Sequence, residues 1–429
     1  MIHRLTQLVR FDAPGCLFIL ALASAASTVS SKSAGLLWLV LIFLCFTAGF
    51  ARSPRSLKGT FQKQNPASLA ISVFLVLAIL ALLLRAVGML PWDDLWEERH
   101  AEGRILLMAL ALAVWGAGRG DDEAMHPNAE SEHLNGVTHG FALACLLAWL
   151  QVWAVGRVNL TTHPIAWAVG VSLLSIWLLH SALWRAQWAW QKWLWLLGGV
   201  CGILAVLTSQ SRGAFGVLAW WAVMVIHWMW RGHSAGLSTT RTWTTLGLVT
   251  LTLLVSLYAT GLWQRPAAVL VQAVTEYQIS QTNLEAASET SLGARLYMWE
   301  RALPAIQAEP LWGYGQEGRR ALILQWGQEA DSALVQSLGH VHNQYLHDML
   351  DNGIWGLASG LTYLFGLGGL AVWLLCRQQP FAGWTLAGVV FMHASASLSN
   401  VNFAHNYYAT MISVVVGLTL MSIRPSRPG

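Results

Sequence analysis

Residues 68–90, with the sequence SLAISVFLVLAILALLLRAVGML, form an unbroken apolar stretch in which Arg85 is the one charged residue. A helix needs about 20 mostly apolar residues to cross roughly 30 Å of hydrocarbon, so this stretch predicts a transmembrane helix. The whole chain is similarly apolar, because 55% of its 429 residues are hydrophobic and only 11% are charged. Since soluble proteins carry roughly 25% charged residues, the composition excludes a soluble enzyme, a disordered chain and a disulfide scaffold.

Similar stretches recur along the sequence and predict about twelve membrane spans. They lie at residues 14–31, 34–50, 68–90, 104–119, 137–156, 164–183, 192–209, 213–230, 243–262, 353–376, 381–398 and 405–423. The first span follows basic residues and ends near small ones, as a signal peptide does, but we favour a retained anchor because the second span follows almost at once. The predicted fold is therefore all-α, a polytopic integral membrane protein with a helical cap on its outer face.

The distribution of Lys and Arg predicts the orientation of these spans, because cytoplasmic loops hold an excess of basic residues. Placing both termini in the cytoplasm puts most of the basic residues inside. The outer loops then keep Lys32, Arg99, Arg104, Arg157 and Arg212. In this arrangement the chain divides into an N-terminal bundle of about nine spans at 1–262, a large outer helical loop at 263–352 and a C-terminal bundle of about three spans at 353–429.

The outer loop is the one long hydrophilic stretch, and its apolar spacing predicts helices. One helix is expected to begin at Pro266, since proline favours the first helical position. A second, amphipathic helix is expected to carry apolar residues at spacings of three and four, namely Leu292, Leu296, Trp299, Leu303 and Ile306. A third is expected from about Arg320 to Leu338.

The five cysteines all lie in apolar runs and predict small buried side chains instead of a redox or metal site. They are Cys16, Cys45, Cys145, Cys201 and Cys376. No phosphate-binding glycine loop, zinc spacing or internal repeat is present in the sequence. The net charge of +4 gives no indication of a nucleic-acid partner.

Three elements on the outer side are candidates for chemistry. The first is Ser209-Gln210-Ser211-Arg212-Gly213, a polar hinge whose guanidinium suits phosphate oxygens. The second is the helix with Arg295 and Trp299, which lie one turn apart and share a face. An anchoring arginine and an interfacial tryptophan are the alternative interpretations of these two elements.

The third element is His340-Val341-His342-Asn343-Gln344-Tyr345 at the membrane rim. Asn343 is a favoured N-cap, so His342 is expected directly before a helix. A neutral imidazole there can take a proton from a hydroxyl group, and a positioned general base contributes roughly 10²–10⁴-fold to a rate. A polar rim residue without catalytic role is the alternative.

Together these elements resemble the O-antigen ligase and polymerase superfamily. The motifs are Ser-x-Ser-Arg-Gly-Ala at 209–214, Arg-x-x-x-Trp at 295–299 with Pro-Leu-x-Gly-x-Gly at 310–315, and His-Asn-x-x-Leu at 342–346. The resemblance extends from residue 209 to the C-terminus, while the first half is similar in topology alone. It implies a C-type glycosyltransferase-like (GT-C-like) architecture in the Gram-negative inner membrane, with a periplasmic site and neither metal nor cofactor.

The resemblance also implies the substrates and the roles of residues. The donor would be a glycan on undecaprenyl diphosphate, and the acceptor a sugar hydroxyl of the lipid A–core oligosaccharide. Arg212 and Arg295, with Arg265 as a third arginine, would bind the diphosphate, and His342 would activate the acceptor for inverting attack. The supporting residues would be Ser209, Ser211, Trp299, His340, Asn343 and Tyr345. The chemistry of the reaction is consistent with these roles, because negative charge accumulates on a diphosphate leaving group and neighbouring cations stabilise it.

Other functions stay open at this point. An O-antigen polymerase would join the glycan to another lipid-linked repeat, and a protein O-oligosaccharyltransferase usually carries a larger C-terminal domain. A glycosidase is disfavoured because no paired carboxylates are evident. A lipid or glycan transporter would show paired charges within the membrane, or broken helices in matching halves.

Overall fold

The computed structural model describes residues 14–51, 66–91, 100–117, 127–234, 271, 274–279 and 281–424. Within these residues the regular structure is helical, as the sequence predicts. The first group of helices is α2 (Pro14–Ala26), α3 (Ser31–Ala51), α4 (Pro66–Gly88), α5 (His100–Ala117), α6 (Pro127–Val155), α7 (Pro164–Trp184), α8 (Ala189–Ser209) and α9 (Gly216–Ser234). The cap helices are α12 (Leu284–Ala287), α13 (Ser291–Ala308), α14 (Gly315–Glu329) and α15 (Ala333–Gln336). The last three helices are α16 (Gln344–Cys376), α17 (Pro380–Ser397) and α18 (Asn406–Met421).

Seven helices among the described residues are long and apolar enough to cross a membrane, which makes the chain a multi-pass membrane protein. They are Ser31–Phe50, Pro66–Gly88, Leu134–Val155, Pro164–Trp184, Ala189–Ser209, Arg212–Trp230 and Gln344–Cys376. Helices α2, α5, α17 and α18 form where further spans are predicted, but they are shorter or less apolar than these seven. The predicted span at 243–262 lies outside the described residues, so the count of about twelve stays a prediction.

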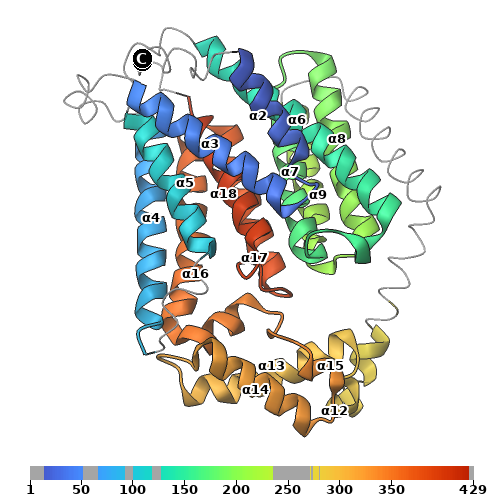
Figure 1. Ribbon diagram of the computed structural model, residues 1–429. Coiled ribbons are helices and arrows are strands. Elements are labelled where there is room, and N and C mark those ends of the chain that lie inside the picture. Colours follow the sequence, from blue (N-terminus) through green and yellow to red (C-terminus); the bar gives the residue numbers. More distant parts are fainter. Residues whose placement is uncertain are drawn as a thin grey trace.

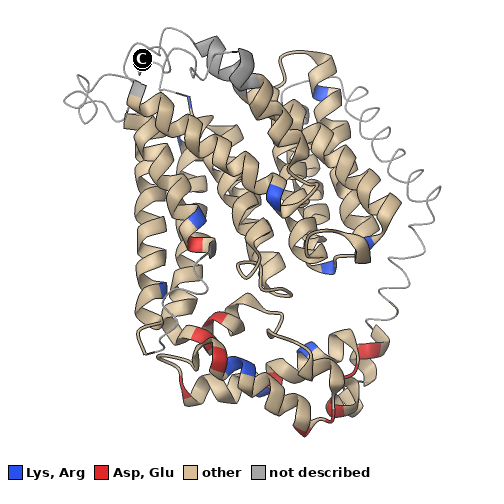
Figure 2. Ribbon diagram, in the orientation of Figure 1, with Lys and Arg blue, Asp and Glu red and all other residues tan. Residues whose placement is uncertain are grey.

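The helices form an upright bundle, and α12–α15 lie across one end of it (Figure 1). Charged residues are sparse in the bundle and frequent in this cap (Figure 2). Such a division follows from the surroundings, because an ionised side chain is costly in hydrocarbon and stable in water.

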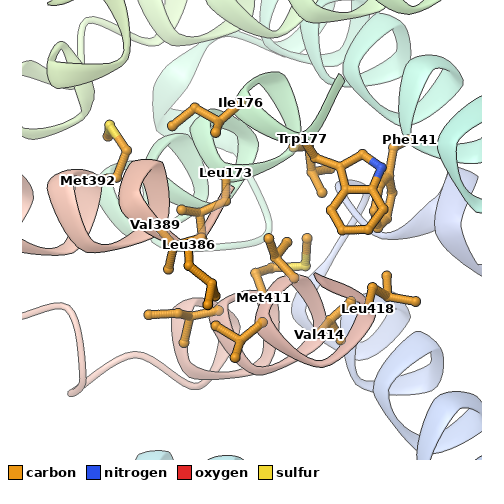
Figure 3. Packing of buried hydrophobic residues seen from close by; sticks show 14 of the residues in the cluster. Phe141, Leu173, Ile176, Trp177, Leu386, Val389, Met392, Met411, Val414 and Leu418 are labelled. Atoms are coloured by element: carbon orange, nitrogen blue, oxygen red, sulfur yellow. The ribbon is translucent and has the colours of Figure 1, made fainter. Parts of the chain in front are cut away.

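Helix α7 forms the centre of the bundle, since its whole apolar segment is buried. It packs against α6, α8, α17 and α18, and glycines allow close approach, as is common between membrane helices. A Cβ on Gly170 of α7 would lie only 2.5 Å from the Tyr407 ring of α18. Figure 3 shows the packing of α7 against α17 and α18 through Leu173, Ile176, Leu386, Val389 and Met411.

Helix α16 is broken at Asn352–Gly353, where the sequence places the junction between the outer loop and the last bundle. Gly353 has φ 59° and ψ −148°, a backbone conformation that few residues other than glycine adopt. The break frees backbone groups, and the turn after α13 satisfies them. Tyr314 N–H donates to the Leu350 carbonyl (2.7 Å), and Ile354 N–H donates to the Pro310 carbonyl (2.9 Å). The cap is thereby joined to a membrane-crossing helix.

The prediction of one continuous helix over 320–338 is wrong, because the chain forms α14 and α15 there. Asp331, between the two helices, has a left-handed φ of 49°. Ser332 then caps α15, with its Oγ accepting the N–H of Val335 at 3.2 Å. A serine hydroxyl that captures a backbone N–H competes with the helical ladder, and the apolar spacing does not record this competition.

The amphipathic helix predicted here forms as α13, and its predicted apolar residues are only partly covered. Leu303 is 53% exposed, and the other members of the predicted face are half-buried. The residues that build the cap core are Ala294, Tyr297, Met298 and Ala302, which pack with Ile323, Trp326, Val335, Val341 and Leu350. The leucine-bearing face of α13 is only partly covered.

Cys45, Cys145 and Cys201 are buried as predicted, but Cys376 is exposed because α16 ends there. The side chain of Cys16 lies outside the described residues. Arg85, which lies within a predicted span, is buried and faces the interior of the bundle.

Candidate functional site

The segment between α8 and α9 presents Arg212 at the start of a short 3₁₀ turn, Arg212–Ala214. Gln210 ends α8 in a left-handed conformation, with φ 54°. The hydroxyls of the two predicted supporting serines make local hydrogen bonds: Ser209 Oγ donates to the Val206 carbonyl (2.7 Å), and Ser211 Oγ donates to the Pro164 carbonyl (3.2 Å). The two serines therefore shape the turn that presents the guanidinium.

Three arginines from separate parts of the chain act on one another electrostatically. Arg212 and Arg157 lower the pKa of Arg295, after the larger effect of burial, and Glu276 opposes them. Burial, followed by the charge of Arg212, lowers the pKa of Arg157. The part of each shift that comes from neighbouring arginines means that these positive charges lie near one another, so a multiply charged anion would be stabilised among them.

No carboxylate within the described residues forms an ion pair with Arg157, Arg212 or Arg295. Glu276, the nearest acidic influence on Arg295, accepts the backbone N–H of Leu292 at 2.8 Å. The three guanidinium groups thus keep donors for a ligand. Arg265, the predicted third arginine, lies outside the described residues, whereas Arg157 was assigned only to a short outer loop by the sequence.

His342 lies near this arginine cluster, in the segment that leads into α16. Burial is the largest of the causes that lower the pKa of His342 to about 2, and the charges of His340, Arg295, His163 and His405 contribute in that order. The imidazole is therefore neutral at physiological pH. Its Nδ1 is buried and has no hydrogen-bond partner within the described part of the chain, so a substrate hydroxyl could occupy that position.

Four histidines gather around this point from three separate segments. The rings of His340 and His342 lie 4.2 Å apart between centroids, those of His163 and His405 stack at 4.2 Å, and those of His340 and His405 lie 6.3 Å apart. Burial is the largest cause that lowers the pKa of His340 to about 4 and of His405 to about 3. His163 and His405 have no motif around them, and the sequence analysis missed both.

The remaining predicted supporting residues hold the histidine segment in place. Trp299 Nε1 donates to the Val341 carbonyl (2.7 Å), which joins α13 to the segment. Asn343 is the N-cap of α16, and its Oδ1 accepts the N–H groups of Tyr345 (3.0 Å) and Leu346 (3.2 Å). The Tyr345 hydroxyl donates to the Ala394 carbonyl of α17 (3.3 Å).

Two buried ion pairs fix the first turns of α16. Asp348 accepts from Arg85 of α4 (2.6 Å) and from Gln344 Nε2 (3.0 Å). Asp351 accepts from Arg319 of α14 (2.5 Å), and His347 Nε2 lies 3.2 Å from its other oxygen. One carboxylate therefore joins α16 to the membrane bundle, and the other joins it to the cap.

The arrangement can bind an anion and accept a proton. The arginines supply charge-assisted, directional donors that suit phosphate oxygens. The neutral imidazole supplies a lone pair beside them. Among the described residues, no group of three or more His, Cys, Asp or Glu side chains is arranged to hold a metal ion.

Comparison with known proteins identifies the segment that carries most of this site. Residues 197–361 match the family model described as "O-Antigen ligase". An uncharacterized protein of Haemophilus influenzae is 31% identical over 167 residues, which cover 38% of this chain and 39% of that relative. The family match includes Arg212, Arg295 and His342, whereas Arg157 and His405 lie outside it.

Proposed function

We propose that this membrane protein transfers a glycan from undecaprenyl diphosphate to a sugar hydroxyl of the lipid A–core oligosaccharide, and the match of residues 197–361 to the family model described as "O-Antigen ligase" supports this. The observation that carries the proposal is the crowding of Arg157, Arg212 and Arg295 beside the neutral His342, with no carboxylate ion pair to these arginines among the described residues. A diphosphate would supply the negative charge that balances these arginines. An acceptor hydroxyl would supply the proton that the neutral imidazole takes.

In the proposed reaction the acceptor oxygen attacks the anomeric carbon from the face opposite to the diphosphate. His342 takes the hydroxyl proton as the new carbon–oxygen bond forms. The bond from the anomeric carbon to the phosphate oxygen breaks, and undecaprenyl diphosphate leaves with the bonding electrons. The arginines stabilise the charge that develops on the leaving oxygen. Because the acceptor attacks from the opposite face, transfer inverts the configuration of the anomeric carbon.

In this scheme the basicity of His342 depends on whether the lipid-linked glycan donor is bound. In the free site the neighbouring positive charge of Arg295 lowers the pKa of His342, after burial and His340. A bound diphosphate would bring negative charge next to these cations and raise that pKa towards the range in which imidazole is an effective base. The acceptor would therefore be activated only when the donor is in place, which protects the lipid-linked glycan from unproductive attack.

The direct test is transfer by the purified protein in detergent micelles, with a lipid-linked glycan and lipid A–core as the substrates. We expect glycan joined to core, and no transfer with His342→Ala or Arg212→Ala. Arg377→Ala is a matched control, because Arg377 lies beyond the far end of α16 and stacks on Trp373. Since micelles have no compartments, product formation would exclude transport as the activity.

A gene-deletion strain separates the ligase from the polymerase. Loss of all glycan from the core, with accumulation of lipid-linked polymer, supports the ligase. Core that carries a single repeat unit would instead show that this chain is the polymerase. Transfer to a purified acceptor protein, with none to core, would identify a protein O-oligosaccharyltransferase.

Two features resemble those expected of a transporter, namely the buried Arg85–Asp348 pair and the broken helix α16. Both have a structural explanation, because the pair and the break join α16 to its neighbours. Helix α16 is also the one helix of the described chain with non-helical residues in its interior, so no matching break is found in a second half.

A further inference from the structure

His342 has a backbone conformation that is unusual for a residue with a side chain. Its φ is 54°, in the left-handed region, where non-glycine residues are uncommon. Such conformations persist where the surrounding structure enforces them, and they occur often at functional sites. The contacts of the segment Gly339–Asn343 therefore indicate what holds the imidazole in place.

The backbone that precedes His342 is fixed by side chains from the cap. Arg319 Nη1 donates to the Gly339 carbonyl, and Trp299 Nε1 donates to the Val341 carbonyl at 2.7 Å. Arg319 is itself held by Asp351. Asn343 fixes the following residue as the helix N-cap. These contacts hold the ends of the turn, but none of them reaches the backbone of His342 itself.

The contact to His342 comes from the other histidine of the segment. The backbone N–H of His342 donates to Nδ1 of His340, at 3.3 Å. Nδ1 can accept only when it carries no proton, so this bond requires the neutral tautomer of His340 with its proton on Nε2. The His340 ring packs against the His342 ring at 4.2 Å and lies 6.5 Å from the His347 ring and 6.3 Å from the His405 ring.

We propose that His340 is a positioning residue, which uses its Nδ1 lone pair to hold His342 in the left-handed conformation that directs the imidazole at the substrate. This inference rests on the proposed role of His342. The His340 side chain closes a tight turn with its own segment and needs no contact with either substrate. Losing the bond would allow His342 to relax towards an ordinary backbone conformation, which would displace the imidazole.

A matched pair of substitutions isolates the lone pair. His340→Asn places an amide oxygen near the position of Nδ1, whereas His340→Leu has a similar size but no acceptor. We expect His340→Asn to keep transfer within about threefold of the parent. We expect His340→Leu to lose about 10²-fold in kcat, because a displacement near 1 Å can have this effect, with an unchanged KM for the lipid-linked donor.

Several results would overturn the inference. Equal kcat values for the two variants would show that the acceptor is irrelevant, and a rise in donor KM alone would show that His340 binds substrate. If His340→Leu does not accumulate in the membrane, His340→Ala removes the same acceptor without adding an apolar branch and is expected to lose kcat equally. Activity in His342→Ala would reject the proposed function itself, whereas inactive His342→Ala with fully active His340→Leu would reject only the positioning role.

Discussion

Arg212 presents a planar guanidinium from a short 3₁₀ turn. Arginine binds phosphate oxygens with two parallel N–H bonds, which a lysine ammonium cannot reproduce. We expect Arg212→Lys to lower kcat/KM for the lipid-linked donor by roughly 10–100-fold, since lost charge-assisted hydrogen bonds are worth about 1.5–3 kcal/mol each. Arg377→Lys is the control and should leave transfer unchanged. Steady-state transfer in micelles measures both, and an equal response of the two variants would show that Arg212 does not bind the donor through this geometry.

The four clustered histidines make the stability of the protein dependent on pH. The ordinary pKa of 6.5 applies in the unfolded chain, and the folded values are lower, at about 4 for His340, 3 for His405 and 2 for His342. As pH falls below 6.5 the unfolded state binds more protons than the folded state, so stability is present at neutral pH and decreases towards pH 4.

Melting temperatures in detergent between pH 7.5 and 4.5 test this dependence. Each of these histidines contributes a slope of less than about 1.4 kcal/mol per pH unit, because none of them is fully buried. His342→Gln removes one titrating group and should make the decline shallower. A melting temperature that does not change over this range would contradict the lowered pKa values.

Single residues of the site differ in how well the sequence reveals them. Arg212, Arg295 and His342 stand in short motifs whose neighbours have clear local roles, such as the serines of the turn and the Asn343 cap. Arg157 and His405 have no such neighbours, and they reach the site only because the helices that flank them pack together. Their position depends on tertiary contacts, which local spacing does not contain.

At the scale of elements, the first turns of α16 are held from two directions. Arg85 of the bundle pairs with Asp348, and Arg319 of the cap pairs with Asp351. Breaking a buried pair by removal of one partner usually costs about 3–5 kcal/mol, because a buried charge is left without its counter-ion. The N-terminus of α16, which His342 immediately precedes, should therefore respond to changes deep in the bundle.

We expect Arg85→Met to destabilise the protein and to reduce transfer, although Arg85 lies in a membrane helix. The double variant Arg85→Met with Asp348→Leu should recover part of the lost stability, since both buried charges are then gone. Recovery should be incomplete because Glu102 also lies 3.9 Å from Arg85. Melting temperatures of the two single variants and the double variant measure the coupling. Additive losses would show that the pair does not connect α4 to α16.

Helix positions follow from apolar spacing, but the breaks between helices do not. The Asn352–Gly353 break is marked by a glycine with a special backbone conformation. The break near Asp331 depends on a serine cap and a left-handed aspartate, within a stretch whose spacing is compatible with one helix. The apolar spacing also does not single out Ala294, Tyr297, Met298 and Ala302, the residues of α13 that are buried in the cap core.

At the scale of the whole molecule, the side of the membrane on which the charged residues lie relates the fold to the proposed function. Arg157 and Arg212 lie in loops that the basic-residue distribution assigns to the outer face. Their electrostatic effect on Arg295, in a cap helix, requires these loops and the cap to share one side of the membrane, and the identity of that side stays a prediction. Composition predicts the membrane location directly, whereas the number of spans and their final arrangement depend on packing that composition leaves open.

Two positions separated by one membrane crossing provide a test of the orientation. Cys376 is exposed at the end of α16, opposite to the cap, and Glu300 is exposed on α13. We expect a membrane-impermeant maleimide to label Glu300→Cys in intact spheroplasts, in a background in which Cys16 and Cys376 are replaced by serine. The natural Cys376 should be labelled only after the spheroplasts are lysed.

The controls for this experiment come from the chain itself. Cys45, Cys145 and Cys201 are buried and should remain unlabelled before and after lysis, which reports that the protein stays folded. Labelling of Cys376 in intact spheroplasts, with Glu300→Cys reactive only after lysis, would place the cap in the cytoplasm. A cytoplasmic cap would remove the site from glycans presented at the outer face, so this one result tests both the topology and the compartment in which the arginines and His342 act.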